Sequence, residues 1–140
     1  MSEIQADIIR YIDAHKLNDN VDVMGYVDIQ KKYELLKSSK IFLFLSHDDS
    51  FPVAVLEAIA CGLPILAYDL DVFASPPYNR ACIKTIKKGN AAAALPWLIN
   101  ALDNYDDFAK EAEKVSKEGA LIPSYEHNAD IEFKLFMGQG

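Results

Sequence analysis

The sequence predicts an α/β fold in which helices cover a doubly wound parallel sheet, and three observations favour this class. Short apolar runs alternate along the chain with segments whose apolar residues recur every three or four positions. The run at residues 41–45 has no polar alternation, which is typical of a strand buried on both faces, so we expect it at the centre of the sheet. The length of 140 residues, with 51% hydrophobic residues, suits one domain with a buried core over residues 1–140.

The chain before this apolar run predicts a helix, a strand and a second helix. Isoleucines at every fourth position share one face of the first helix, which we expect over residues 2–16, with Ser2 in a capping box. β-Branched residues predict the strand, over residues 21–27, with a turn at its glycine. Asp28 is suited to cap the second helix, which runs to about Ser38.

The chain after the apolar run predicts further helices and strands and one long loop. Gly62 is suited to end a helix, and Pro64 lies at the start of a strand, where its missing N–H does least harm. Asn90 is suited to cap the helix after the last strand. We expect a helix over residues 53–61, strands over 63–68 and 81–86 with a loop at 69–80 between them, and then helices over 90–102, 107–117 and 124–136.

Composition and charge exclude several classes of function. A net charge of -7 at pH 7 argues against a nucleic-acid partner, which needs a basic face. The sequence has no apolar window of the roughly 18 residues that a membrane span requires and no signal-peptide pattern, so we expect a cytoplasmic protein. Cys61, Cys82 and the histidines lack metal-ligand spacing, so we expect reduced, buried thiols and no metal site.

Residues 46–57, SHDDSFPVAVLE, follow the most apolar strand, and ligands of doubly wound sheets lie off the carboxyl ends of the strands. Asp49 and Glu57 are eight residues apart, so both carboxylates could border one cavity and accept hydrogen bonds from sugar or ribose hydroxyls. The first N–H groups of the helix, from Val53 onward, suit a phosphate, and Pro52 suits the first helical position. The alternative is an ordinary strand–turn–helix junction in which Asp49 only caps the helix.

Several short motifs follow one another at fixed spacing over residues 21–69. They are Gly25-Tyr26-Val27, Leu35-Leu36, Ser46, Asp49-Ser50-Phe51-Pro52, Leu56-Glu57-Ala58 and Ala60-Cys61-Gly62-Leu63-Pro64. Together they resemble the carboxy-terminal domain of the family-four GT-B-fold glycosyltransferases, the "group one" retaining transferases. The resemblance implies a Rossmann-like domain, the carboxy-terminal half of a GT-B fold, that serves hexosyl transfer from a nucleotide-diphosphate sugar with retention of anomeric configuration.

The resemblance also implies a role for each site residue. In this family the first acid of a paired-glutamate motif contacts the donor sugar and corresponds to Asp49, and the second holds the ribose and corresponds to Glu57. No cofactor is implied, since the nucleotide sugar is a substrate. The expected sugar-binding residues are Asp49, Ser50, Phe51 and Pro52, and the expected nucleotide-binding residues are Glu57, Val53, Gly25, Tyr26 and Val27.

The chain departs from the family pattern in two ways. Asp49 replaces a glutamate, and Ser50 and Pro52 replace glycines, so the carboxylate is one methylene shorter and one backbone donor is lost. The basic first strands of the family domain and its amino-terminal acceptor domain have no counterpart in the sequence. We therefore expect an incomplete domain that has no complete catalytic site, is inactive alone and is completed by a missing amino-terminal domain or subunit.

Two functional classes stay open at this point. The first is the donor-binding part of a retaining glycosyltransferase, and the second is a non-catalytic, degenerate module that binds a nucleotide sugar or a partner. A nucleotide-sugar epimerase with the same architecture is a third class, which no motif favours. Unpaired strand edges would favour a homodimer, and contact with a membrane surface is an alternative that the sequence does not predict.

Overall fold

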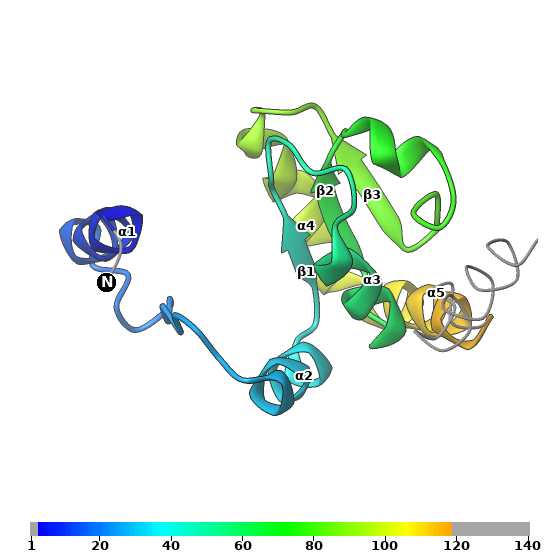
Figure 1. Ribbon diagram of the computed structural model, residues 1–140, viewed down its shortest axis with the longest axis horizontal. Coiled ribbons are helices and arrows are strands. Elements are labelled where there is room, and N and C mark those ends of the chain that lie inside the picture. Colours follow the sequence, from blue (N-terminus) through cyan, green and yellow to red (C-terminus); the bar gives the residue numbers. More distant parts are fainter. Residues whose placement is uncertain (1–2, 119–140) are drawn as a thin grey trace, which may run out of the picture. The chain divides into compact units, whose positions relative to one another are not determined.

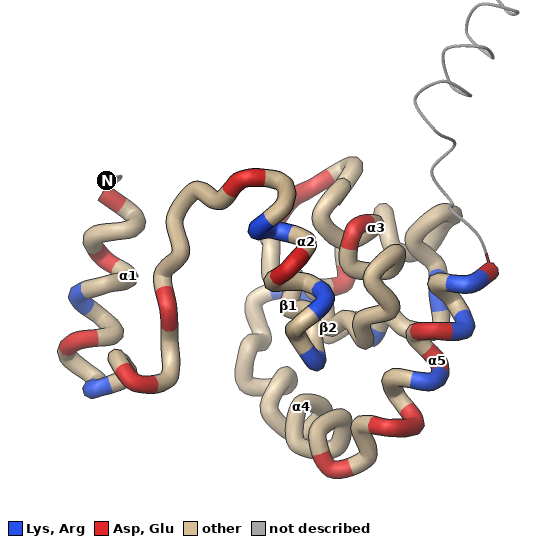
Figure 2. The backbone as a smooth tube through the Cα atoms, turned by 90° about the horizontal axis from the view of Figure 1, so that it is seen from below, with Lys and Arg blue, Asp and Glu red and all other residues tan. Residues whose placement is uncertain are grey.

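The structure is a computed structural model that describes residues 3–118 and divides the chain into two units, Met1–Glu34 and Leu35–Gly140. Within the described residues of the second unit, β1 (Phe42–Phe44), β2 (Ile65–Tyr68) and β3 (Ile83–Ile86) form a three-stranded parallel sheet in the order β1-β2-β3 (Figure 1). Helices lie on both sides of it, with α3 (Val53–Ala60) and α4 (Ala94–Asp103) on opposite faces (Figure 2). This arrangement confirms the predicted α/β class with a parallel, Rossmann-like sheet.

The register of the sheet brings the carboxyl ends of its strands to one edge. Phe42 pairs with Ile65, and Ile65 pairs in turn with Ile83. The helix α3 connects β1 to β2, whereas the connection from β2 to β3 is a loop that contains a short 3₁₀ helix, η1 (Asp71–Ala74). The loops that follow the three strands therefore emerge side by side.

The position of β1 corrects one prediction, because this strand lies at the edge of the sheet and not at its centre. Each residue of β2 is buried, whereas Leu43 in the middle of β1 is 45% exposed. Among the described residues no strand pairs with the outer edge of β1. An apolar run shows that a strand can be covered on both faces, but it does not fix the position of the strand in the sheet.

The first unit contains α1 (Glu3–Ala14) and the first residues of α2 (Ile29–Ser38). The strand predicted over residues 21–27 is wrong, since these residues have no regular secondary structure. Strands are stabilised by hydrogen bonds to a neighbouring strand, and the described residues of this unit contain none. The cap of α2 is confirmed, because Asp28 Oδ1 accepts a hydrogen bond from the N–H of Lys31 at 2.8 Å.

The remaining helices agree with the sequence except where α4 and α5 begin. Gly62, with a φ of 73°, follows the end of α3 as expected. The predicted cap at Asn90 is wrong, because the 3₁₀ turn η2 (Ala91–Ala93) separates this residue from α4 and its side chain makes no cap hydrogen bond. The helix α5 (Tyr105–Lys117) begins two residues earlier than predicted. The capping residue Ser2 and the helix expected at residues 124–136 lie outside the described residues.

The core lies between β2, α3 and α5. Its fully buried members include Ile65 and Leu66 of β2 and Val55 of α3, and Cys82 is buried beside them as a free thiol. Cys61 is also free, but it is only half-buried, contrary to our prediction that both thiols are buried.

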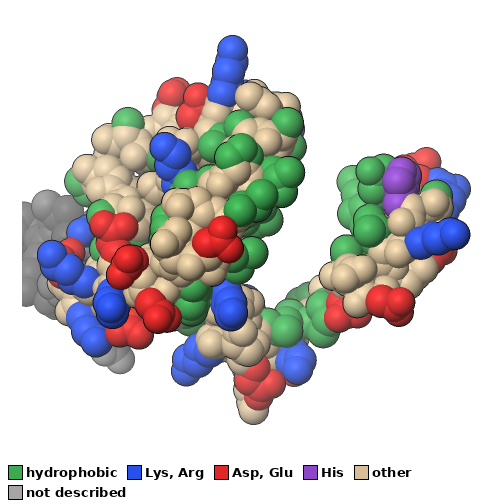
Figure 3. All heavy atoms as spheres, turned by 180° about the vertical axis from the view of Figure 1, so that it is seen from behind, with side chains coloured by type: hydrophobic (Ala, Val, Ile, Leu, Met, Phe, Trp, Pro, Cys, Tyr) green, Lys and Arg blue, Asp and Glu red, His purple; other side chains and the backbone are tan. Residues whose placement is uncertain are grey.

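The helix α4 buries small residues and leaves large apolar residues exposed. Its buried residues are alanines, and a row of large apolar residues on it is exposed. Hydrophobic side chains gather in one area of the surface that Figure 3 shows. The exposed row consists of Leu95, Ile99 and Leu102. None of the helices in the described part of the chain has both the length and the hydrophobicity to cross a bilayer.

Candidate functional site

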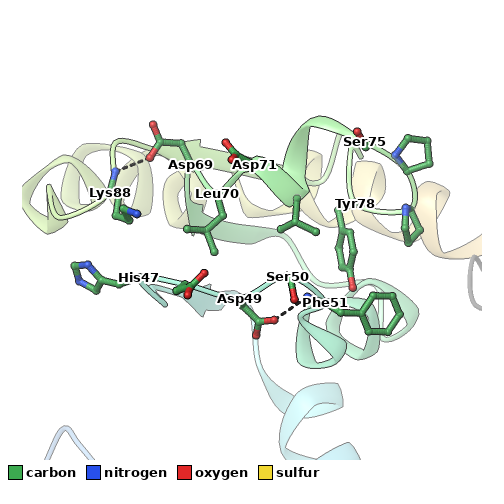
Figure 4. Close-up of a pocket in the computed structure, with 14 residues that line it drawn as sticks. His47, Asp49, Ser50, Phe51, Asp69, Leu70, Asp71, Ser75, Tyr78 and Lys88 are labelled. Atoms are coloured by element: carbon green, nitrogen blue, oxygen red, sulfur yellow. Dashed lines mark hydrogen bonds between the residues drawn. The ribbon is translucent and has the colours of Figure 1, made fainter.

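A pocket of about 570 Å³ opens at the carboxyl ends of the strands (Figure 4). Residues 47–51, which follow β1, form one wall, and several residues between 69 and 78, which follow β2, form the other. Lys88, which follows β3, lies at one end. The volume falls in the range of small-molecule sites, and the position is the one where doubly wound sheets bind their ligands.

Asp49 holds the turn on the first wall of the pocket. Its Oδ1 accepts a hydrogen bond of 2.9 Å from the backbone N–H of Phe51, drawn as a dashed line in Figure 4. This is an Asx turn, which fixes the backbone around Ser50. A carboxylate has two oxygens that can each accept more than one hydrogen bond, so Asp49 keeps capacity for ligand hydroxyls while it holds the turn.

The structure brings some of the predicted site residues together and leaves others apart. Asp49, Ser50 and Phe51 line the pocket. Pro52 is buried behind them at the start of α3, and Glu57, farther along the helix, is half-buried and does not line this pocket. The expectation that both acids border one cavity is therefore not met by this pocket.

The other predicted nucleotide-binding residues lie at the start of α3 and in the first unit. Val53 is the first residue of α3, so Pro52 occupies the N-cap and not the first helical position that we predicted for it, and no side chain caps this helix. The N–H groups of Val53 and Ala54 therefore remain available as donors at the positive end of the helix dipole, whereas the N–H of Val55 donates to the carbonyl of Pro52 at 3.0 Å. Gly25, Tyr26 and Val27 belong to the first unit, where Gly25 has a φ of 62° and Tyr26 is exposed.

The second wall of the pocket contains functional candidates that the sequence did not single out. Asp69 follows β2 directly, and its Oδ1 accepts a hydrogen bond of 2.6 Å from the backbone N–H of Lys88. This bond ties the loop after β2 to the loop after β3. Asp71 and Tyr78 also line the pocket from this loop. The position of Asp69 and Asp71 just after an apolar strand was the signal that could have identified these two residues, whereas no local signal marks Tyr78.

Tyr78 is the most deeply buried of these residues. Its side chain is 2% exposed, and its hydroxyl has no hydrogen-bond partner in the described part of the chain. The ring makes edge contacts with Phe51 and Phe73, at centroid distances of 6.0 and 6.1 Å. Burial raises the pKa of Tyr78 above its ordinary value, and the negative charge of Asp49 adds to the effect. The phenol is therefore neutral and able to donate a hydrogen bond at physiological pH.

Acidic side chains predominate around the pocket. Asp48, Asp49, Asp69 and Asp71 line it, against the side chains of Lys88 and His47. Carboxylates accept hydrogen bonds from hydroxyls and repel phosphate, so the pocket is suited to a polyhydroxylated ligand. Within residues 3–118 no group of three or more His, Cys, Asp and Glu side chains is placed to hold a metal ion.

Comparison with known proteins matches residues 3–119 to the family described as "Glycosyl transferases group 1". The chain belongs to this family. It is 29% identical over 108 residues to the alpha-galactosylglucosyldiacylglycerol synthase of Streptococcus pneumoniae, an alignment that covers 71% of this chain and 26% of that protein. It is also 29% identical over 122 residues to a subunit of the phosphatidylinositol N-acetylglucosaminyltransferase of Arabidopsis thaliana, covering 74% of this chain and 27% of that protein. The chain thus spans about a quarter of the length of these relatives.

Proposed function

We propose that the chain is the donor-binding part of a retaining glycosyltransferase, which moves a hexosyl group from a nucleotide-diphosphate sugar to an acceptor. One observation carries the proposal. In a member of the group 1 glycosyl transferases, the acidic pocket at the carboxyl ends of β1 and β2 includes Asp49, which the motif resemblance matches to the sugar-binding acid of the family. In this proposal residues 1–140 act as a single, partial nucleotide-sugar-binding domain.

The proposed roles divide the donor between the pocket and the helix start. Asp49 accepts hydrogen bonds from the sugar hydroxyls, and Ser50, Phe51 and the buried Pro52 shape the wall beside the sugar. The diphosphate lies at the uncapped N–H groups of Val53 and Ala54, because the helix dipole favours an anion there, whereas the acidic pocket disfavours one.

Glu57 accepts hydrogen bonds from the ribose in this proposal, outside the pocket that holds the sugar. Gly25, Tyr26 and Val27 lie near the base. These four assignments rest on the resemblance of the motifs to those of the family.

We also propose an acceptor class for the whole protein. One relative is named for a diacylglycerol glycolipid and the other for phosphatidylinositol. A lipid hydroxyl, presented at the cytoplasmic side of a membrane, is therefore the proposed acceptor. The acceptor site and the basic groups that neutralise the diphosphate are expected in a further domain or subunit.

A binding and activity experiment tests the proposal. The 140-residue chain is titrated calorimetrically with UDP-, GDP- and ADP-linked glucose, galactose and N-acetylglucosamine, and each donor is also tested for transfer to lipid vesicles that contain diacylglycerol or phosphatidylinositol. We expect at least one nucleotide sugar to bind, Asp49→Ala to weaken it, and the isolated chain to show no turnover. Turnover by this chain alone would disprove the proposed incompleteness, and absence of any binding would disprove the donor-binding role.

A degenerate, non-catalytic module is the second candidate. It is favoured by the hydrogen bond from Phe51 to Asp49, which gives this carboxylate a structural role, and by the N–H that is absent at Pro52. A full-length protein that binds a nucleotide sugar but fails to transfer it would favour this candidate over the enzyme.

A further inference from the structure

The unpaired hydroxyl of Tyr78 is an anomaly in the apolar core of the second unit. Buried hydroxyl groups in proteins nearly always have a hydrogen-bond partner, because a buried, unpaired polar group is costly. Tyr78 is 2% exposed, and its Oη has no partner among the described residues. An unpaired donor at the wall of a pocket indicates that the partner arrives with a ligand.

The direction of the side chain supports this interpretation. Tyr78 comes from the loop between β2 and β3, and its ring crosses toward the opposite wall, so that the hydroxyl points to the turn at Ser50 and Phe51 (Figure 4). Asp49 is close enough for its charge to act on the phenol. The hydroxyl therefore points to the turn that is held by the carboxylate which the proposed function assigns to the sugar.

The hydrogen-bonding chemistry of the pocket calls for a donor at this position. A sugar hydroxyl both donates and accepts hydrogen bonds, whereas ionised aspartates only accept them. Four aspartates line the pocket. A neutral phenol beside Asp49 supplies the complementary donor, so that the pair can satisfy both functions of vicinal hydroxyls.

We propose that Tyr78 is a sugar-binding residue whose hydroxyl donates a hydrogen bond to an oxygen of the donor sugar. The ring of Phe51, which is 58% exposed, packs edge-on against the ring of Tyr78 at a centroid distance of 6.0 Å. In this proposal the exposed ring moves aside when the sugar binds, and the hydroxyl comes within reach of the sugar. The inference rests on the proposed donor-binding function and adds a residue from the second wall of the pocket.

The test compares Tyr78→Phe with a matched control, Tyr105→Phe, which makes the same change on α5 away from this pocket. Calorimetry measures the affinity of each variant for UDP-, GDP- and ADP-linked hexoses and for UDP, GDP and ADP alone. We expect Tyr78→Phe to weaken binding of the nucleotide sugar by about 5- to 20-fold and to change binding of the nucleoside diphosphate by less than about twofold. The melting temperature should not fall, since the variant removes an unpaired buried hydroxyl.

Each contrary outcome has a distinct meaning. Equal affinity of Tyr78→Phe and the wild type for the nucleotide sugar would overturn the role of the hydroxyl while leaving the proposed function intact. An equal loss of affinity for the nucleoside diphosphate would show that Tyr78 does not act on the sugar. If the wild type binds no nucleotide sugar, the proposed function fails and this inference fails with it.

Discussion

Replacement of Asp49 by alanine and by asparagine separates the two roles that the structure gives to this carboxylate. Asp49→Ala removes the acceptor of the 2.9 Å hydrogen bond from the N–H of Phe51. Asp49→Asn removes the charge but retains an oxygen at the same position, since asparagine also forms Asx turns. The two variants therefore differ in the turn and agree in the loss of the carboxylate charge.

The expected stabilities follow from the one hydrogen bond. A single bond of this kind contributes about 0.5–1.5 kcal/mol to the free energy of unfolding. Asp49 is only half-buried, so water can replace part of the lost interaction, and we expect Asp49→Ala to cost about 1 kcal/mol or less. Asp49→Asn should lower the free energy of unfolding by less than Asp49→Ala does, because the asparagine oxygen can still accept the hydrogen bond. Urea unfolding followed by circular dichroism measures both values, and the m-values should not change.

The charge of Asp49 has its own readout at Tyr78. The carboxylate contributes to the raised pKa of this phenol, so its removal should lower the pKa of Tyr78 in both variants. A pH titration of the Tyr78 ring signals by NMR measures the effect. Binding of the nucleotide sugar should also weaken in both variants. Equal stability of Asp49→Ala and the wild type would refute the role in the turn, and an unchanged pKa of Tyr78 would refute the proximity of the two groups.

Three further outcomes are expected. Burial raises the pKa of Cys82 from 9.0 to about 11, so the unfolded state loses this proton first as pH rises, and the free energy of unfolding should fall between pH 9 and 11. Between these two pH values the free energy of unfolding should fall by about 1–2 kcal/mol more in the wild type than in Cys82→Ala. Chemical denaturation at a series of pH values measures both proteins, and parallel pH profiles of the two would contradict the prediction. Gly62→Ala should lower the free energy of unfolding by about 1 kcal/mol in the same assay, because a φ of 73° is strained for a residue with a Cβ. The Cβ itself would meet only ordinary contacts, so the backbone angle alone sets this value. An unchanged free energy of unfolding would show that the strain is relieved. If the outer edge of β1 supports the proposed homodimer, Leu43→Lys should shift the protein toward monomer in sedimentation, and a monomeric wild type would disprove the dimer.

The sequence predicted those elements whose pattern is local. The helix α3 and the strand β2 were recognisable because an apolar segment, a glycine stop and a proline at a strand start each follow from the chemistry of a few neighbouring residues. The position of β1 and the absence of a strand at residues 21–27 depend on strand pairing, which no local pattern encodes.

The same division applies to the site. Asp49, Ser50 and Phe51 could be predicted because they follow an apolar strand directly. Tyr78 could not, because it enters the pocket only through the packing of a loop that begins nine residues earlier, after a neighbouring strand. Its unpaired hydroxyl is visible only in three dimensions.

Mapping the binding site of the donor by NMR tests the proposed sugar pocket. Amide signals of the ¹⁵N-labelled chain are followed while the nucleotide sugar that binds in calorimetry is added, and then while its nucleoside diphosphate is added alone. We predict that the sugar-dependent shifts concentrate at residues 47–51 and 69–78. Sugar-dependent shifts that avoid both walls of the pocket and gather elsewhere, for instance around Lys40 and residues 103–110, would contradict the assignment.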